Sequence, residues 1–323
     1  MTLRHWATLG VGLLGTLIFC APAHGQMLGL DQPTGVSPVP IKITATNGME
    51  WDQQTRTMIA SGHAKAVRGS VTVTADRLVA HFVTKATTGK SSPHEGDASG
   101  TLANFSFGQS QLSELDAIGN VHIFSPSQQA FGAKAVYHMA SGELVLTGTG
   151  LRLITPEETI TASKALEYWS HRGKAVAIGH ALIVTNDHRS ISADVLIGYF
   201  KRFEADPSVH GTGQQKRQAQ GTGGQLRKVV AHGHVVLHTA TDIATGDNAE
   251  YNPETGIAVL AGNVHITHGR NELMGARAQV DTKTGIAMLT AATGTRVQGL
   301  VIPNSAKPET VGSPQSGRKA DGS

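Results

Sequence analysis

Histidines and aspartates are the side chains of this sequence with the most obvious capacity for chemistry. The chain has 16 histidines, and His232, His234 and His238 have the spacing best suited to a metal ion. In a strand, residues an even number apart lie on one face, so these three imidazoles could face one ion. No carboxylate lies beside them at a tight ligand spacing. We therefore interpret them as a solvated strand edge, and the sequence predicts no metal site.

Three aspartates, Asp76, Asp194 and Asp247, occupy equivalent positions in repeated segments. Each lies where the alternation of apolar residues along a strand changes phase, which is typical of a bend or bulge.

The sequence contains no nucleophile elbow, P-loop or dinucleotide-binding glycine pattern. In a chain with so many histidines and serines, combinations of Ser, His and Asp arise by chance and carry no weight. The sequence therefore predicts neither an enzyme nor a cofactor.

A unit led by glycine recurs along the chain. Each copy has the glycine, a short strand of alternating apolar residues, a polar turn, and a second strand with its own apolar alternation. Asn or His often follows the glycine, and both tolerate positive φ, so we expect a tight local turn there. The leading glycines are Gly62, Gly119, Gly148, Gly179, Gly233, Gly262 and Gly294, and the Asn and His residues after them are His63, Asn120, His180, His234 and Asn263.

The units are arranged as a tandem duplication. Advancing the chain by about 115 residues superimposes Gly62 on Gly179 and Gly119 on Gly233. We expect one module over 41–157 and a second over 158–302, with an extended lead-in (26–40) and a disordered Pro/Ser/Gly/Lys tail (303–323). Repeats of about 30 residues are typical of stacked structures in which each hairpin buries its apolar face against its neighbours.

The composition narrows the fold class further. Charged residues make up 16% of the chain, aromatic residues 5%, and glycine contributes 38 of 323 residues. Low charge with high glycine favours many short strands and tight turns over long helices. The formal net charge is only +3, and no basic run is interleaved with aromatics, so the sequence predicts no nucleic-acid partner.

Residues 1–25 have the pattern of a signal peptide. Arg4 and His5 precede an apolar stretch, and small residues follow it at spacings that a signal peptidase accepts. We expect export, with cleavage after Ala23 or Gly25. Either cut removes Cys20, the single cysteine of the chain, so the sequence predicts a mature protein without a disulfide.

Several motifs in a fixed order carry a resemblance to a known family. The run Ile41-Lys42-Ile43 comes first, then turns of the type Gly-Asn-Val-x-Ile and strands of the type Val/Ile-x-Ala-Asp-x-Leu, and last a closing segment over 294–303. This series, which covers roughly 41–303, resembles the LptA/OstA-type family of periplasmic lipopolysaccharide-transport proteins. The family's usual chain is shorter, close to one and a half modules.

The resemblance implies an all-β fold, an elongated twisted β-jellyroll of repeated antiparallel hairpins that is open at both ends. It also implies a periplasmic protein of Gram-negative outer-membrane biogenesis, which shields the lipid A acyl chains of lipopolysaccharide in a V-shaped apolar groove. Such proteins stack end to end by strand pairing. The implied partners are lipopolysaccharide, inner-membrane LptC-like and outer-membrane LptD-like OstA domains, and a second copy in a head-to-tail homo-oligomer.

The resemblance implies that the inward-facing side chains contact lipid. Which side chains face inward follows from the alternation of apolar residues, with one change of phase in each unit. Ile41 and Ile43 are included because the resemblance places lipid contact on the first strand. The predicted groove residues are Ile41, Ile43, Val71, Val73, Leu78, Phe82, Val121, Ile123, Ala181, Ile183, Ile191, Leu196, Phe200, Val235, Leu237, Val264 and Ile266.

Three other interpretations remain open from the sequence, one of them a purely structural surface β protein, which would be distinguished by the absence of bound lipid. A membrane-anchored LptC-like component of the same pathway would retain the N-terminal apolar segment, and the duplication and the small-residue cleavage site argue against it. A β-solenoid carbohydrate-active protein would share the glycine content and the repeat length. That class should show aromatic platforms beside clustered carboxylates, which the scattered aromatics of this chain do not supply.

Overall fold

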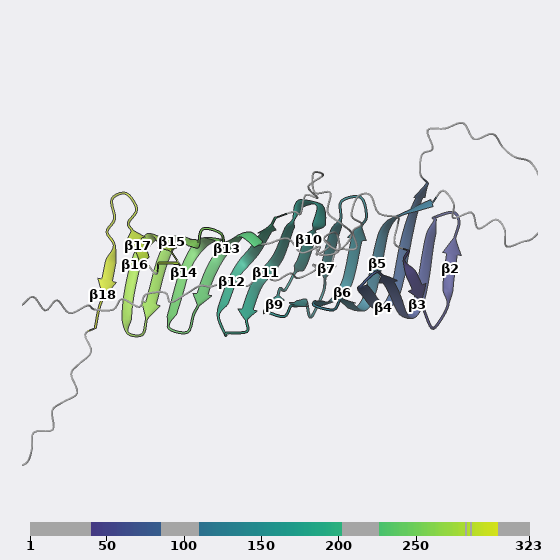
Figure 1. The fold of residues 1–323 in the computed structure, drawn as a ribbon, viewed down its shortest axis with the longest axis horizontal. Helices are drawn as coiled ribbons and strands as arrows, with labels where there is room; N and C mark the ends of the chain where they lie inside the picture. The colour runs from purple at the N-terminus through teal and green to yellow at the C-terminus, as the bar shows by residue number, and fades with distance from the viewer. Residues whose placement is uncertain (1–39, 85–109, 202–225, 282, 285, 303–323) are drawn as a thin grey trace, which may run out of the picture.

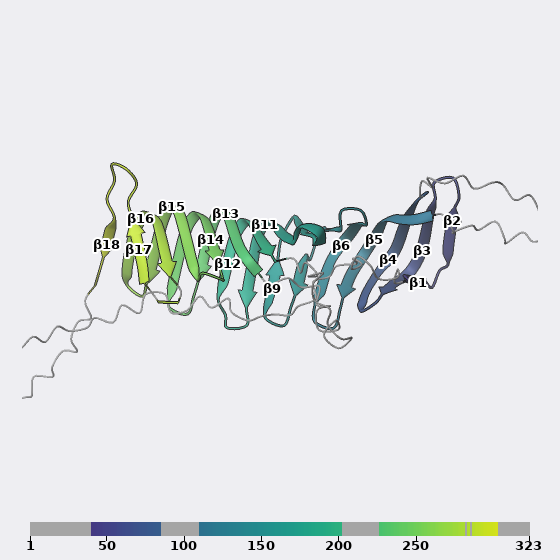
Figure 2. The ribbon, with the colours of Figure 1, turned by 45° about the horizontal axis from the view of Figure 1, so that its top comes forward.

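The computed structural model describes residues 40–84, 110–201, 226–281, 283–284 and 286–302. The predicted signal peptide and tail, and the lead-in apart from its last residue, lie outside these ranges. Within them the chain forms an elongated stack of antiparallel strands (Figures 1 and 2). The strands are β1 (Lys42–Thr44), β2 (Met49–Asp52), β3 (Thr57–Arg68), β4 (Val71–Thr84), β5 (Ser110–Phe124), β6 (Gln129–His138), β7 (Glu143–Thr147), β8 (Arg152–Ile154), β9 (Glu158–Thr161), β10 (Ala165–Trp169), β11 (Lys174–Thr185), β12 (Ser190–Phe200), β13 (Leu226–His238), β14 (Asp242–Asn252), β15 (Ile257–His268), β16 (Asn271–Asp281), β17 (Ile286–Thr290) and β18 (Gln298–Leu300).

Most of the stack is a meander of long strands. Strands β3 to β6 pair in sequence order, as do strands β11 to β16. All described strands join one sheet of 18 strands, and all of its pairings are antiparallel. The expectation of an all-β fold built from repeated antiparallel hairpins is confirmed. No helix in the described ranges is long and apolar enough to cross a membrane.

At four places a long strand is replaced by two short ones. Strands β1 and β2 both pair with β3 at the N-terminal end, and β17 and β18 both pair with β16 at the C-terminal end. In the middle, β7 and β8 both pair with β6, while β9 and β10 both pair with β11. The sheet continues through this middle region because β7 pairs with β10 and β8 with β9.

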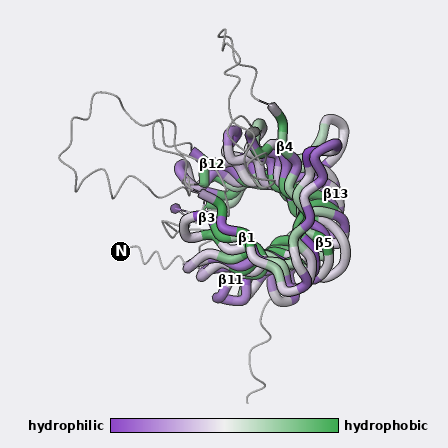
Figure 3. Tube along the Cα trace, turned by 90° about the vertical axis from the view of Figure 1, so that its right-hand side faces the viewer, coloured by the Kyte–Doolittle hydropathy of each residue, from purple (hydrophilic) through white to green (hydrophobic). Residues whose placement is uncertain are grey.

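The long strands bend at the glycine units. Gly262 and Asn263 have φ of 77° and 47°, and the pairing register shifts between Ala261 and Val264. These bends let the sheet curl around the long axis, so the trace forms a ring when viewed from the end (Figure 3). The expected positive φ is found at every Asn and His that follows a leading glycine, namely His63 (43°), Asn120 (46°), His180 (42°), His234 (47°) and Asn263 (47°).

A carboxylate on the preceding strand holds three of these bends. The aspartates lie where the sequence predicted bend residues, and each contacts the side chain that follows the glycine of the next strand. This bend role is therefore confirmed. The pairs are Asp76 Oδ2 with Asn120 Nδ2 (2.9 Å), Asp194 Oδ2 with His234 Nδ1 (2.8 Å), and Asp247 Oδ2 with Asn263 Nδ2 (2.8 Å).

At two further bends the neighbouring strand is split, and a hydroxyl replaces the carboxylate. The hydroxyl and the backbone N–H of Thr46 donate to the carbonyl of Gly62 at 2.9 and 2.8 Å. Ser163 makes the same two hydrogen bonds to the carbonyl of Gly179, at 2.9 and 2.7 Å. The connections between β1 and β2 and between β9 and β10 are thus tied to the bends beside them.

A recurrent turn fixes the register of three hairpins and was not predicted from the sequence. Its first residue, Asp52, Asn252 or Asp281, accepts through Oδ1 from the backbone N–H groups two and three positions later, at 2.8–2.9 and 3.2 Å. Hydrogen bonds from the side chain and backbone of Thr55 lower the pKa of Asp52. Such a turn pre-sets the chain reversal between antiparallel strands.

The bends give a stability prediction. A Cβ at Gly262 would overlap the carboxylate of Asp247, whereas Gly269, at φ 59°, has nothing within 4 Å of a Cβ. Both Ala substitutions strain a positive φ by about 1–2 kcal/mol. We expect Gly262→Ala to lower the free energy of unfolding by about 1 kcal/mol more, because a hydrogen bond is also lost. Urea unfolding of both variants measures this difference, and equal losses would contradict it.

Candidate functional site

The interior of the curled sheet is the candidate site. Its buried apolar side chains form one cluster that extends from Ala60 on β3 to Ala278 on β16. Successive side chains of an extended strand point to opposite faces of the sheet. Each strand therefore contributes every second side chain to this cluster. Both modules therefore share one apolar interior in the described part of the chain.

The structure brings nearly all predicted groove residues to this interior. Those that are buried in the cluster are Val71, Val73, Leu78, Val121, Ile123, Ala181, Ile191, Leu196, Val235, Val264 and Ile266. Those that are partly buried and pack against it are Ile41, Ile43, Phe82, Ile183 and Leu237. Phe200 is half-buried at the end of β12, beside Gly198, outside the cluster. Their contact with lipid remains a prediction.

Interior residues that sequence reasoning missed are mostly small. Ala60, Ala64 and Ala231 have no exposed surface, and Tyr137 is the largest side chain that is fully buried. The alternation along each strand that identified their larger neighbours also indicates that these residues face inward. Ala231, for example, follows Val229 by two residues. Alanine gives little hydrophobic contrast on its own, so these positions were easy to overlook.

The second module contains an apolar cavity within this interior. Its free volume is about 50 Å³, which is space for a few water-sized groups. A chain of many methylenes therefore fits only if the interior side chains move apart. The cavity is lined by residues of β12 to β16, including Ile191, Val229, Ala231, Leu237, Ala244, Leu260, Ile266 and Val280.

Polar groups occupy inward positions near the turns. Asp242 is buried, and its carboxylate accepts from the Thr241 hydroxyl at 2.7 Å and lies 2.5 Å from Nδ1 of His268. Glu158 lies two residues from Ile160, which packs against the interior cluster. Burial, and then the neighbouring Glu157, raise the pKa of Glu158. The apolar interior thus gives way to polar groups near these turns.

The histidines singled out by spacing do not form a site. A bulge lies between His232 and Val235, so the even spacing of His232 and His234 does not direct them to a common point. His232 Nδ1 lies 2.8 Å from Asn248 on β14, whereas His234 Nδ1 lies 2.8 Å from Asp194 on β12. All three histidines are exposed, as the sequence suggested, but the expectation of a strand edge is wrong, because β13 pairs with β12 on one side and β14 on the other.

The comparisons with known proteins bear on this architecture. Residues 42–174 and 159–286 each match the family model described as "LptA/(LptD N-terminal domain) LPS transport protein". The chain belongs to this family. The resemblance stated from the sequence is confirmed, and the family model matches twice along the chain, with the two matches sharing residues 159–174. The module bounds at 157 and 158 stay a prediction. The LptA/LptD N-terminal family is one of lipopolysaccharide transport, and that role applies to this chain.

A solved structure is also similar to this member of the family. It is the crystal structure of LptH, described as the LptA homologous periplasmic component of the conserved lipopolysaccharide transport device from Pseudomonas aeruginosa. The identity is 14% and the TM-score 0.35, over 45% of this chain and 95% of that chain. No curated protein matches the chain.

The exposed Asp194–His234 contact gives a pH prediction. The hydrogen bond that the His234 ring donates to Asp194, and then the negative charge of Asp194, raise the pKa of His234. A pKa raised by folding means that the contact stabilises the protein below the unfolded pKa, and this contribution is lost as pH rises through the folded pKa. We expect Asp194→Asn to lower the pKa of His234 in an NMR titration of the histidine ring. An unchanged pKa would contradict the contact.

Proposed function

We propose that this protein carries lipopolysaccharide across the periplasm, with the acyl chains of lipid A held in the apolar interior. In this proposal it joins its neighbours end to end through the strand edges at both ends. The observation that carries the proposal is one uninterrupted apolar interior running between two unpaired sheet edges. Its delivery to the periplasm depends on the predicted signal peptide over 1–25.

The chemistry of the interior supports acyl chains as cargo. Its cluster is dominated by Val, Leu, Ile and Ala, and the cavity in the second module is lined almost entirely by apolar residues. Burial of a methylene group contributes about 0.8 kcal/mol without any directional contact. An interior of this kind holds acyl chains of different lengths, and a chain can shift along it without breaking hydrogen bonds.

The two ends of the stack support assembly. Among the described residues, β1 and β2 pair only with β3, and β17 and β18 pair only with β16, so each has a side without a partner strand. At the C-terminal end, Ile286, Met288, Leu300 and Val301 are more than half exposed. Unpaired edges with exposed apolar side chains invite strand addition from another sheet. The proposed partners are LptC-like and LptD-like OstA domains and a second copy of this chain.

Lipid contact can be tested by site-specific photo-crosslinking. A photoreactive residue at Leu237, which lines the cavity, should form an adduct with lipopolysaccharide in intact cells. Val236 is the matched control, because neighbouring residues of a strand point to opposite faces. Val121, which is buried in the first module, provides a second interior position.

We expect adducts at Leu237 and Val121 and none at Val236. Adducts of equal yield at Val236 and Leu237 would contradict a lipid-bearing interior. Absence of adducts at both interior positions, in a protein of normal abundance, would also contradict it.

Assembly can be tested with charges at the C-terminal edge. Ile286→Lys with Met288→Lys places two ammonium groups on β17, where strand addition would have to desolvate them. We expect the variant to remain monomeric by light scattering at concentrations where the unmodified chain associates. Ile243→Lys, at an exposed position of β14, is the control and should associate normally. Association that is unchanged by the β17 charges would contradict this joint.

A further inference from the structure

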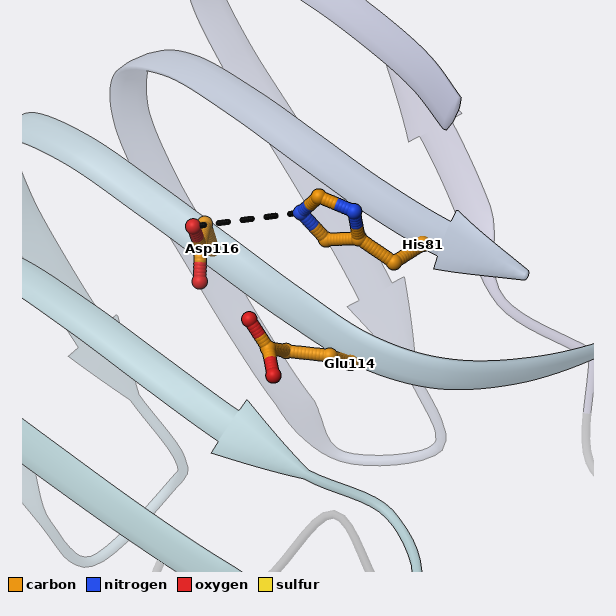
Figure 4. Close-up of side chains that lie close together, drawn as sticks. All are labelled: His81, Glu114 and Asp116. Atoms are coloured by element: carbon orange, nitrogen blue, oxygen red, sulfur yellow. Dashed lines mark ion pairs between the residues drawn. The ribbon is translucent and has the colours of Figure 1, made fainter. Parts of the chain in front are cut away.

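Three ligand-type side chains converge on the outer face of the first module. They are His81 on β4 and Glu114 and Asp116 on β5, and their imidazole nitrogen and carboxylate oxygens all lie within 4.8 Å of one another. Figure 4 shows the His81 ring and both carboxylates directed toward a common space. In the described part of the chain, no other group of three His, Cys, Asp or Glu residues comes as close.

Strand register brings a fourth ligand-type side chain to the same place. His81 lies directly opposite Glu114, and Glu114 lies directly opposite His138 on β6. The three side chains therefore form a His-Glu-His row across three strands, and Asp116 follows Glu114 by two residues on the same face. His138 Nδ1 lies 2.9 Å from Glu114 Oε2.

Asp116 has an unmet requirement for a partner. Its Oδ1 atom is buried and has no hydrogen-bond partner, and the whole side chain is only 15% exposed. The contacts of Oδ2 are long, at 3.8 Å to Lys134 Nζ and 4.0 Å to His81 Nε2. A buried carboxylate oxygen without a partner is costly, and a cation bound beside it would remove that cost.

We propose that His81, Glu114 and Asp116, with His138 as the fourth ligand, bind one divalent transition-metal ion of the zinc class. Two imidazoles with two carboxylates suit Zn²⁺, whereas Ca²⁺ and Mg²⁺ require more oxygen ligands. Zinc bonds of about 2.0–2.1 Å place tetrahedral ligand atoms about 3.3 Å apart. The ligand atoms of His81, Glu114 and Asp116, which lie within 4.8 Å of one another, therefore move closer together when the ion binds. His138 lies outside that group and turns toward the ion from its contact with Glu114. Lys134, whose side chain is 48% exposed, then turns into solvent.

The second module shows that the fold does not require this cluster. His81 lies five residues after Asp76, and the residue five positions after Asp194 is Tyr199. Glu114 lies six residues before Asn120, and the residue six positions before His234 is Lys228. Tyr199 and Lys228 are also paired directly across β12 and β13, in the same register. Lys228 there forms an ordinary ion pair with Glu250, at 2.7 Å.

The place of the site in the fold gives the ion a structural role. It joins β4, β5 and β6 on their outer faces, while the inner faces of the same strands carry the buried Leu78, Leu115 and Tyr137. Because the ion binds the folded arrangement and links three strands, it stabilises the first module by mass action. This inference does not depend on lipid binding, so each can fail without the other.

The experiment is titration of the purified, metal-stripped full chain with Zn²⁺, followed by calorimetry and by the melting temperature. We expect about one equivalent of Zn²⁺ to bind and the melting temperature to rise. Glu114→Gln and Asp116→Asn should each weaken binding at least about tenfold. Lys134→Gln should strengthen it severalfold, because a competing positive charge is removed. His232→Gln, which changes an exposed histidine in the second module, is the matched control and should leave binding unchanged.

The variants are compared by circular dichroism and melting temperature without metal, so a folding defect is separated from a lost ligand. Bound Co²⁺ gives an independent readout, because its visible spectrum distinguishes four-coordinate from six-coordinate ions. The proposal is overturned if the unmodified chain binds no Zn²⁺, or if both carboxamide variants retain its affinity. Binding of Mg²⁺ or Ca²⁺ as tight as that of Zn²⁺ would also overturn it.

Discussion

The contact between an aspartate and the Asn or His after a glycine is the constraint on which the shape of this protein depends. A glycine and an Asn or His, both with positive φ, place an extra residue in a strand, and the strand bends. The carboxylate of an aspartate on the neighbouring strand contacts the side chain at the bend and so fixes the position of the bend relative to that strand. These bends recur in alternate long strands, β3, β5, β11, β13 and β15. Because each is held against its neighbour, the sheet curls as a whole and has an inner and an outer face.

The inner and outer faces of the sheet differ in how similar their residues are between the two modules. Interior positions are filled by interchangeable apolar residues, and the same types recur in both modules, as with Val121 and Val235 or Ile123 and Leu237. Outer positions differ between the modules even where the strand register is identical, as with His81 and Tyr199. A duplicated fold of this kind therefore keeps a common interior along its length, while chemistry specific to one module resides on the outer face.

Much of the fold could be predicted from the sequence because its determinants are local. Positive φ at Asn120 and His234 follows from residue type, and the inward set follows from alternation along each strand. Phe200 is the exception in that set, because it lies at the last residue of β12, where the packing of the interior ends. The recurrent turns at Asp52, Asn252 and Asp281 had a readable pattern as well, an Asp or Asn followed three residues later by Thr.

The outer cluster could not be predicted in the same way. His81, Glu114 and His138 come from three different strands, and only the pairing register brings them together. For His232 and His234 the even spacing was misleading, because the bulge between them turns one side chain to β14 and the other to β12.

The split strands in the middle of the stack set its mechanical character. In β3, β5, β11, β13 and β15 a continuous backbone passes through the bend and ties the two halves of the strand together. Between β6 and β11 this continuity is interrupted in two successive layers, β7 with β8 and β9 with β10. We expect any bending and twisting of the stack to be concentrated in this middle region, because fewer residues cross it in continuous strands. There the sheet is continued by the short ladders of β7 with β10 and of β8 with β9.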